Sequence, residues 1–239
     1  MPEGEAPHPV AVLVHGGFWR MPWGADLMHA LAGDLHRRGW ATWNLEYRRL
    51  GAPGGGWPGT FEDAAAGMDA IAAVDAGLDL GRVVAVGHSA GGQLSLWLAT
   101  RSGLPAGAPG AGPAVVPSAV VALAAVSDLA ASSRLGLDGD AAAELVGGPP
   151  DRVPERYAVA SPRERLPLGV PVLLVHGDAD DRVPVAMSRE YAGAARAAGD
   201  DVDLEVVPGS GHPELIDPRS GAWEVVRRWL GGPHIPVAM

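Results

Sequence analysis

Short apolar runs recur along the chain and alternate with stretches in which apolar residues stand three or four positions apart. Short, continuous apolar runs are typical of strands buried in a parallel sheet, and the longer spacing is typical of helices. We expect six strands, over Val10–Val14, Ala41–Tyr47, Val83–Val86, Ala119–Val126, Val170–Val175 and Leu204–Val207. The alternation predicts an α/β protein, in which helices cover both faces of a mostly parallel sheet of about six to eight strands.

The segments between the strands predict five helices. They cover Asp26–Arg38, about 60–76, the stretch after Gly91, about 184–199, and the stretch after Pro218. Thr60 and Asp63 have the spacing of a capping box, so we expect them to begin the second of these helices.

The chain length and the irregular stretches favour one domain with a small insertion. A chain of 239 residues is within the usual size of a single α/β domain, so we assign 1–239 to one domain. Residues 128–165 have weak periodicity and several prolines. We expect this segment to form a short cap after a strand.

The composition excludes several kinds of chemistry and partner. The chain has no cysteine, and all 18 of its basic residues are arginine, which excludes thiolate chemistry and any mechanism that needs a lysine. The formal net charge of −10 disfavours binding to nucleic acid or anionic membranes. The histidines show no metal-ligand spacing. We therefore expect a cytoplasmic protein without metal, cofactor, nucleic-acid partner or membrane partner.

A candidate nucleophile lies between a strand and a helix. Gly87, His88, Ser89, Ala90 and Gly91 follow the strand that ends at Val86. This G-x-S-x-G pattern is typical of a nucleophile elbow, a strained turn that projects the serine hydroxyl above the sheet. Ser89 is the predicted nucleophile.

A second glycine-rich turn follows the first strand. His15, Gly16, Gly17, Phe18 and Trp19 come directly after Val14. Glycines let the backbone approach a substrate and point N–H groups at a developing oxyanion. We expect His15 itself to brace this turn by hydrogen bonding.

Candidates for the acid and the base follow the last two strands. Asp178, Asp180 and Asp181 follow the fifth strand, and His212 follows the sixth on a loop flanked by glycine. A serine nucleophile needs a histidine base, and that histidine needs a carboxylate to orient it. The order of serine, aspartate and histidine along the chain fits this requirement, although the spacing leaves three aspartates in competition.

With these motifs, the chain from Val10 to about Leu230 resembles the α/β-hydrolase superfamily. The family pattern H-G-x-x-D-x-x-V-P implies that Asp180 is the acid. The same resemblance implies an oxyanion hole formed by the backbone N–H groups of Gly17, Phe18 and Ala90. The segment His-Gly-Gly-x-Trp is similar to the motif of the kynurenine formamidase (arylformamidase) branch.

The favoured function is a serine hydrolase that cleaves small carboxylic esters through an acyl-enzyme, without a cofactor. Hydrolysis of an N-formylkynurenine-type amide, as in an arylformamidase, is the alternative reaction. A catalytically inactive binding module ranks below both, because all three triad members are present. The expected partner is a small-molecule ester or amide.

Aromatic residues near the presumed site are candidates for the substrate pocket. Trp19, Trp23 and Trp57 stand in or near loops at the active-site end, and His88 adjoins the nucleophile. These four residues are the predicted substrate-binding residues, and a hydrophobic rim over the sheet is the alternative role for the tryptophans.

One departure from the superfamily pattern concerns the start of the chain. Superfamily members place two further strands before the first strand seen here, whereas nine residues precede Val10. We expect either a minimal hydrolase of about six strands or a shortened form of a longer protein. The strand Ala41–Tyr47 would then lie at the sheet edge, where a loop, a tail or a second copy in a homodimer covers it.

Overall fold

Six parallel strands form one sheet in the order β2-β1-β3-β4-β5-β6. The structure is a computed structural model that describes residues 2, 4, 6–74, 76–232 and 235. The strands are β1 (His8–Val14), β2 (Ala41–Leu45), β3 (Leu78–His88), β4 (Ala119–Leu123), β5 (Val172–Gly177) and β6 (Val202–Val207). All six expected strands are present, and the predicted fold class is confirmed. The second and fourth strands end earlier than predicted, at Leu45 and Leu123.

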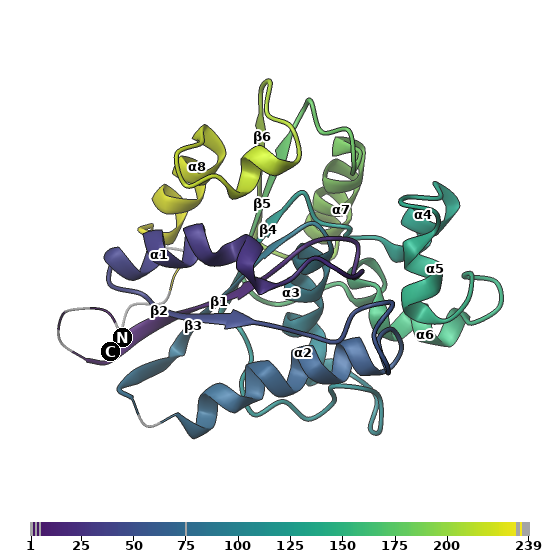
Figure 1. Ribbon diagram of the computed structural model, residues 1–239, viewed down its shortest axis with the longest axis horizontal. Coiled ribbons are helices and arrows are strands. Elements are labelled where there is room, and N and C mark those ends of the chain that lie inside the picture. Colours follow the sequence, from purple (N-terminus) through teal and green to yellow (C-terminus); the bar gives the residue numbers. More distant parts are fainter. Residues whose placement is uncertain (1, 3, 5, 75, 233–234, 236–239) are drawn as a thin grey trace.

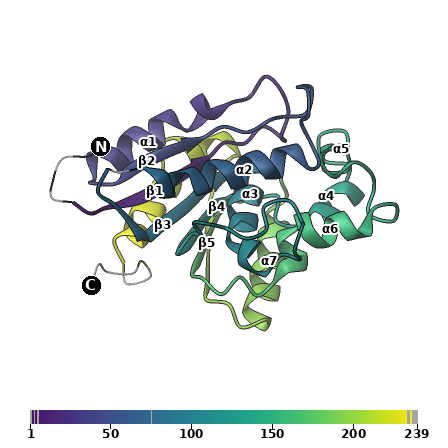
Figure 2. The same cartoon turned by 90° about the horizontal axis from the view of Figure 1, so that it is seen from below.

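Helices cover both faces of the sheet (Figure 2). The helices α1 (His29–Arg37) and α8 (Gly221–Leu230) pack on one face, and α2 (Gly59–Asp69), α3 (Ala90–Thr100) and α7 (Val185–Ala197) pack on the other. Short 3₁₀ helices complete the connections: η1 (Ala25–Met28), η2 (Ala70–Ala73), η3 (Arg101–Gly103), η4 (Pro162–Arg165) and η5 (Pro213–Ile216). In β1, Val10 and Val12 face α2 and α3, whereas Ala11 and Leu13 face α1 and α8. This alternation explains why the strand is apolar throughout.

The predicted capping box at the start of α2 is wrong. Thr60 lies inside the helix, where its Oγ1 donates to the carbonyl of Arg48 at 2.6 Å. Asp63 accepts two hydrogen bonds from the Arg48 side chain and one from its backbone N–H. Both residues therefore anchor the segment that follows β2 to the helix.

The strand β2 occupies one edge of the sheet, as predicted. Its side chains are tied to neighbouring helices: Trp43 Nε1 donates to the carbonyl of Gly67 at 2.9 Å, and Asn44 Nδ2 donates to the carbonyl of Ala25 at 2.7 Å. Helical segments thus cover both faces of this edge strand. Pairing of its outer backbone with a second copy stays a prediction.

The segment 128–165 contains three short α-helices beyond the carboxyl ends of the strands (Figure 1). They are α4 (Leu129–Arg134), α5 (Ala141–Val146) and α6 (Pro154–Ala160). Arg20 ties this cap to the turn after β1, because its Nε lies 2.9 Å from Asp138 Oδ2 and its Nη1 lies 2.6 Å from Glu144 Oε2. We call these three residues the clasp.

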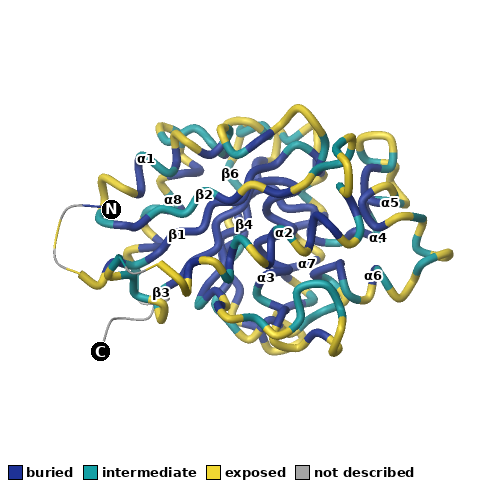
Figure 3. Tube along the Cα trace, turned by 60° about the horizontal axis from the view of Figure 1, so that its bottom comes forward, coloured by how far each residue is buried: buried dark blue, intermediate teal, exposed yellow. Residues whose placement is uncertain are grey.

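Burial is deepest along the middle of the sheet (Figure 3). Every residue of β4 is buried, and so is the second half of β3. Because all six strands are parallel, their carboxyl ends lie at the same edge of the sheet, and so do the loops that follow them. The predicted functional motifs all lie on these loops.

Candidate active site

Six predicted site residues from separate parts of the chain line one cavity. Ser89 follows β3, His212 follows β6 and Phe18 belongs to the turn after β1. The cavity has a volume of about 470 Å³. Its other lining residues include Gly17, Arg20, Met21, Trp23, His88 and Asp138.

Ser89 has a backbone conformation that L-amino acids rarely adopt. Its φ is 57° and its ψ is −119°, a strain of about 1–3 kcal/mol that surrounding structure has to hold. Glycines make the tight turn sterically accessible. A Cβ on Gly87 would lie 2.1 Å from the carbonyl oxygen of Gly91, and a Cβ on Gly91 would lie 2.0 Å from that of Val14. The turn therefore has the geometry expected of a nucleophile elbow.

Asp180 and His212 are joined by a short hydrogen bond. Nδ1 of His212 lies 2.6 Å from Oδ2 of Asp180, and the Asp180 side chain is 0% exposed. The second oxygen, Oδ1, accepts the backbone N–H groups of Arg182 and Val183 at 2.8 and 2.9 Å. Within the described residues, no hydrogen bond joins Ser89 Oγ to His212, although both residues line the cavity. Catalytic hydrogen bonds of this kind often form only when substrate is bound.

The environment of Asp180 keeps its carboxyl group ionised. Burial by itself raises the pKa of Asp180. Hydrogen bonds from His176, His212 and the Val183 N–H lower the pKa by more than burial raises it, so that it lies well below the usual range. A permanent carboxylate at this position is suited to orienting an imidazole and stabilising its cationic form.

The two competing aspartates face other groups. Asp178 accepts the backbone N–H of Gly209 at 2.6 Å, and Asp181 is an exposed residue 3.7 Å from Arg182. Among the three aspartates, the structure places only Asp180 in contact with His212.

His176 is a site residue whose role the sequence analysis did not identify. Its ring is fully buried, with Nε2 3.3 Å from Asp180 Oδ2 and 2.9 Å from the carbonyl of Val183. Nδ1 lies 2.7 Å from Ser188 Oγ, so the ring is held from both sides. The available signal was its place as the first residue of the H-G-x-x-D pattern. His176 thus supports the carboxylate opposite the predicted base.

The turn after β1 presents unpaired N–H groups close to Ser89. Gly17 and Phe18 have φ values of 102° and 47°, and within the described part of the chain their N–H groups donate to no acceptor. Ala90 is the first residue of α3, where a helix leaves the N–H without an intrahelical acceptor. A Cβ on Gly17 would lie 2.3 Å from Cβ of Trp23, so only glycine fits there. These three N–H groups are available to bind an oxyanion.

His15 braces the same turn, as the sequence suggested. It is fully buried, its Nε2 lies 2.8 Å from Glu46 Oε1, and its Nδ1 lies 2.8 Å from the carbonyl of Gly16. Its ring stacks on Tyr47 with the centroids 4.2 Å apart, and the Tyr47 hydroxyl donates to the His15 carbonyl at 2.9 Å. These contacts fix the backbone on which Gly17 and Phe18 depend.

The prediction that Trp19 binds substrate is wrong. Trp19 is 0% exposed and its Nε1 donates to Gln93 Oε1 at 3.0 Å. Its positive φ of 56° turns the side chain into the core, away from the cavity. Trp19 therefore supports the turn from beneath.

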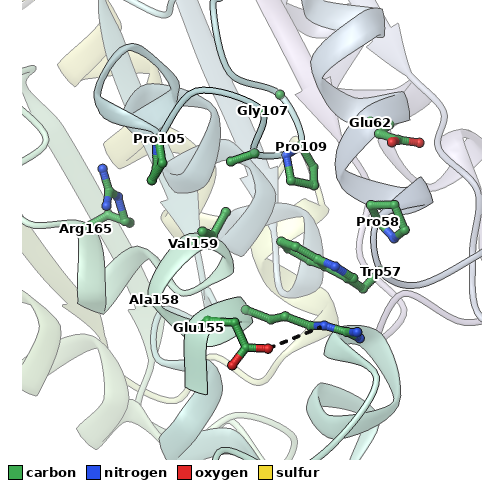
Figure 4. A pocket seen from close by; sticks show the side chains of 13 residues that line it. Trp57, Pro58, Glu62, Pro105, Gly107, Pro109, Glu155, Ala158, Val159 and Arg165 are labelled. Carbon is green, nitrogen blue, oxygen red and sulfur yellow. Dashed lines mark ion pairs between the residues drawn. The ribbon is translucent and has the colours of Figure 1, made fainter. Parts of the chain in front are cut away.

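The prediction for Trp57 is also wrong. Trp57 lies in a separate cavity of about 810 Å³, together with Pro109 and Val159 (Figure 4). The lining of that cavity includes neither Ser89 nor His212. The ring packs edge-on against Phe61, with the centroids 5.4 Å apart.

Trp23 and His88 do lie at the cavity that contains Ser89. Trp23 is 52% exposed, so its ring can contact a bound molecule. His88 is buried, and its Nε2 lies 3.1 Å from the carbonyl oxygen of His212. Of the four predicted substrate-binding residues, Trp23 is therefore the one that the structure places as an accessible wall.

The described residues contain neither a candidate metal site nor a candidate membrane span. Within them, no group of three or more histidine, aspartate or glutamate side chains could hold a metal ion. No helix in the described ranges has the length and apolar character needed to cross a membrane.

Comparison with known proteins finds a relative that is named as an esterase. Esterase LipC of Mycobacterium tuberculosis (strain ATCC 25618 / H37Rv) is 30% identical over 223 residues, which are 88% of this chain and 54% of LipC. This chain thus spans about half the length of that relative.

Solved structures of esterases have the same fold. The thermophilic esterase Est2 of Thermogutta terrifontis with bound propionate has a TM-score of 0.75 and 21% identity over 98% of this chain and 87% of that chain. A truncated carbohydrate esterase from gut microbiota has a TM-score of 0.76 and 22% identity, covering 96% and 87%. The BD-FAE family model matches residues 1–194. The chain therefore has the α/β-hydrolase fold, and it belongs to the BD-FAE family.

Proposed function

We propose that the protein is a serine esterase that cleaves small carboxylic esters. One observation above all supports this: the Asp180–His212 hydrogen bond of 2.6 Å adjoins the cavity in which Ser89 stands on a strained turn. The relative LipC is named as an esterase, which agrees with the proposal, and this chain aligns with about half of its length.

In the proposed mechanism, Ser89 Oγ attacks the ester carbonyl and His212 Nε2 takes its proton. Asp180 holds Nδ1–H, which leaves Nε2 as the basic nitrogen and stabilises the imidazolium. The N–H groups of Gly17, Phe18 and Ala90 bind the oxyanion, and each such donor contributes about 3–4 kcal/mol to the transition state. His212 then protonates the leaving alcohol, and water hydrolyses the acyl-enzyme in the same way.

The size and lining of the cavity support a compact substrate. A volume of about 470 Å³ is at the lower end of the range for small-molecule sites, about 300–1,000 Å³. Met21, Trp23 and Ile216 give it an apolar side. We propose a small ester as the substrate and no nucleic acid or membrane as partner. A cytoplasmic location and a homodimer remain predictions from the sequence.

Formamidase activity remains the alternative reaction. It was inferred from the segment His15–Trp19, in which the tryptophan is now found buried against Gln93. That tryptophan cannot contact a formyl amide in the cavity. Ester hydrolysis is therefore the proposal, and N-formylkynurenine belongs in the substrate panel as the comparison.

A fluorophosphonate probe tests the proposed nucleophile, because it reacts only with an activated serine. We expect the probe to label the protein at Ser89 and to abolish hydrolysis of p-nitrophenyl acetate. The control is Ser89→Ala, which should fold normally and lose both labelling and turnover. Labelling at another serine, or turnover by Ser89→Ala above a trace, would overturn the proposal.

A further inference from the structure

His88 connects the nucleophile turn to the loop that carries the base. It is the residue before Ser89, its side chain is buried, and its Nε2 lies 3.1 Å from the carbonyl oxygen of His212. The two rings are also in contact, with centroids 4.4 Å apart and planes tilted by 46°. A carbonyl oxygen only accepts hydrogen bonds, so this contact requires a hydrogen on His88 Nε2.

The other side of His88 contacts the oxyanion turn. A Cβ on Gly16 would lie 3.1 Å from His88 Nδ1 and 2.9 Å from the His88 carbonyl oxygen. Gly16 therefore packs directly on His88, and a larger residue in that place would push the two segments apart. One buried ring is thus in contact with the segments that carry the oxyanion donors, the nucleophile and the base.

His88 is suited to a neutral, donating role and unsuited to proton transfer. Burial, together with the nearby His212 ring, lowers the pKa of His88 to about 3. The hydrogen bond to the His212 carbonyl and the charge of Asp180 raise this pKa, but by less. His176 acts in the same direction as His212. At neutral pH the ring therefore carries one hydrogen, and the bond to His212 places it on Nε2. A neutral neighbour also allows His212 to become a cation during the reaction without a second positive charge beside it.

Asp178 and the Ala179 N–H hold the base loop at Gly209 and Ser210, and His88 holds it at His212. Gly209 and Gly211 flank the loop before His212, and Gly209 has a positive φ of 69°. Glycine leaves a chain more conformational freedom than any other residue. The hydrogen bond to Asp180 fixes one end of the His212 imidazole, and the bond from His88 fixes the backbone of the same residue.

We propose that His88 is a positioning residue of the active site, whose Nε2–H holds the carbonyl of His212 and so keeps the imidazole aligned between Asp180 and Ser89. This inference rests on the proposed esterase function for its kinetic consequence and on the geometry alone for its tautomer. This positioning role replaces the expectation that His88 binds the substrate.

The kinetic test compares two variants of the full-length protein. His88→Leu keeps the bulk and removes the donor, whereas His88→Gln places an amide N–H near the original Nε2. A misalignment of about 1 Å lowers rates by up to about 10²-fold. We expect His88→Leu to lower kcat for p-nitrophenyl acetate at least about tenfold, with KM changed less than about twofold. The rate of inactivation by the fluorophosphonate should fall in parallel, and His88→Gln should restore most of both rates.

Controls separate positioning from packing and from substrate binding. His36→Leu makes the same chemical change at an exposed histidine of α1 and should leave kcat and KM as they are. A rise in KM at constant kcat in His88→Leu would show a substrate contact and overturn the inference. Equal losses in His88→Gln and His88→Leu would show that the bond to His212 does not matter. If His88→Leu fails to fold, His88→Asn, whose amide is too short to reach, replaces it.

A second measurement does not depend on catalysis. Nitrogen NMR of the histidine side chains in the wild-type protein reports which ring nitrogen carries hydrogen. We expect His88 to be in the Nε2–H form at every pH from 5 to 8. A His88 ring that gains a second proton within that range, or carries its hydrogen on Nδ1, would overturn the inference even if the protein proved not to be an esterase. Absence of labelling at Ser89 would instead overturn the proposed function alone.

Discussion

Oδ2 of Asp180 lies 2.6 Å from Nδ1 of His212, and the Asp180 side chain is completely buried. The same oxygen lies 3.3 Å from Nε2 of His176, and Oδ1 accepts two backbone N–H groups. Both oxygens of the carboxylate thus have donors on them. These contacts hold the carboxylate toward His212, and the imidazole keeps Nε2 as its basic nitrogen.

Replacing this carboxylate should have a large kinetic effect. Asp180→Asn removes the charge and favours the wrong tautomer of His212, so we expect kcat to fall by about 10⁴. Asp178→Asn and Asp181→Asn are matched controls on the same turn and should change kcat far less. Steady-state kinetics on p-nitrophenyl acetate measure all three. A larger loss in Asp178→Asn than in Asp180→Asn would contradict the assignment.

Trp23 and Trp19 should respond differently to truncation. Trp23 is exposed at the cavity, so Trp23→Ala should lower kcat/KM more for aryl esters than for ethyl esters. The additional loss for aryl esters should be about two- to tenfold, which corresponds to about 0.5–1.5 kcal/mol of transition-state stabilisation. Comparison of phenyl and ethyl esters of one acid measures this. Equal losses on the two esters would remove Trp23 from the substrate pocket.

Trp19→Ala should act on the fold. The residue is buried and bonded to Gln93, so its truncation should lower the free energy of unfolding by about 3–5 kcal/mol. Any loss of kcat/KM should be the same for aryl and alkyl esters, because the turn as a whole loosens. Chemical denaturation and the ester panel together check this. A loss confined to aryl esters with unchanged stability would restore Trp19 as a substrate contact.

The clasp should make the cap sensitive to salt. Arg20 is only partly exposed, but Asp138 and Glu144 are more exposed, so each ion pair contributes about 0–1 kcal/mol and is screened by salt. Arg20→Leu should raise KM and speed proteolysis within 128–165. Added NaCl should also raise KM and speed proteolysis in the wild-type protein, and it should change both less in Arg20→Leu. Arg219→Leu, which breaks an exposed pair with Asp217, is the control. An unchanged KM and cleavage pattern in Arg20→Leu would show that the cap holds without the clasp.

Acid should weaken the pair between Asp69 and Arg101. Burial by itself raises the pKa of Asp69. Hydrogen bonds from Arg101 and from the N–H groups of Val115 and Ala114 lower the pKa by more than burial raises it. The folded pKa therefore lies below the unfolded value of about 3.9, so the stabilisation is present above pH 4 and is lost as pH falls through the folded pKa.

Asp69→Asn leaves the buried Arg101 without its partner and should destabilise the protein by about 3 kcal/mol at pH 7. Urea unfolding at several pH values should show this difference shrinking between pH 5 and pH 3. Asp217→Asn, in a surface pair with Arg219, should show little effect at any pH. A difference for Asp69→Asn that stays constant down to pH 3 would contradict the shift.

The order of strands and helices followed from the sequence because it depends on local properties. Apolar runs with no polar break require burial on both faces, and four of the six predicted strands have this character. The other two, Ala41–Tyr47 and Leu204–Val207, contain polar residues and form the edge strands β2 and β6. Ser89, Asp180 and His212 could be found because each follows one of these strands, and parallel strands end at one edge. The three residues lie at one edge of the sheet because all the strands are parallel, and the alternation of strands and helices in the sequence already predicts parallel strands.

Side-chain directions in the loops depended on the tertiary structure. Gly17, Phe18 and Trp19 all have positive φ, which no hydrophobic period encodes, and this conformation turns Trp19 into the core. Trp57 belongs to another cavity because the turn before α2 lies beside α6, where Arg156 stands over the Trp57 ring at 5.9 Å from its centroid, although the two residues are about 100 positions apart in the sequence. The bond between His88 and His212 joins residues 124 positions apart. The sequence by itself determined which residue types reach the active-site edge of the sheet. Only the packed structure decided which of them face the cavity, because the loops take their conformations from contacts with distant segments and not from a repeating backbone geometry.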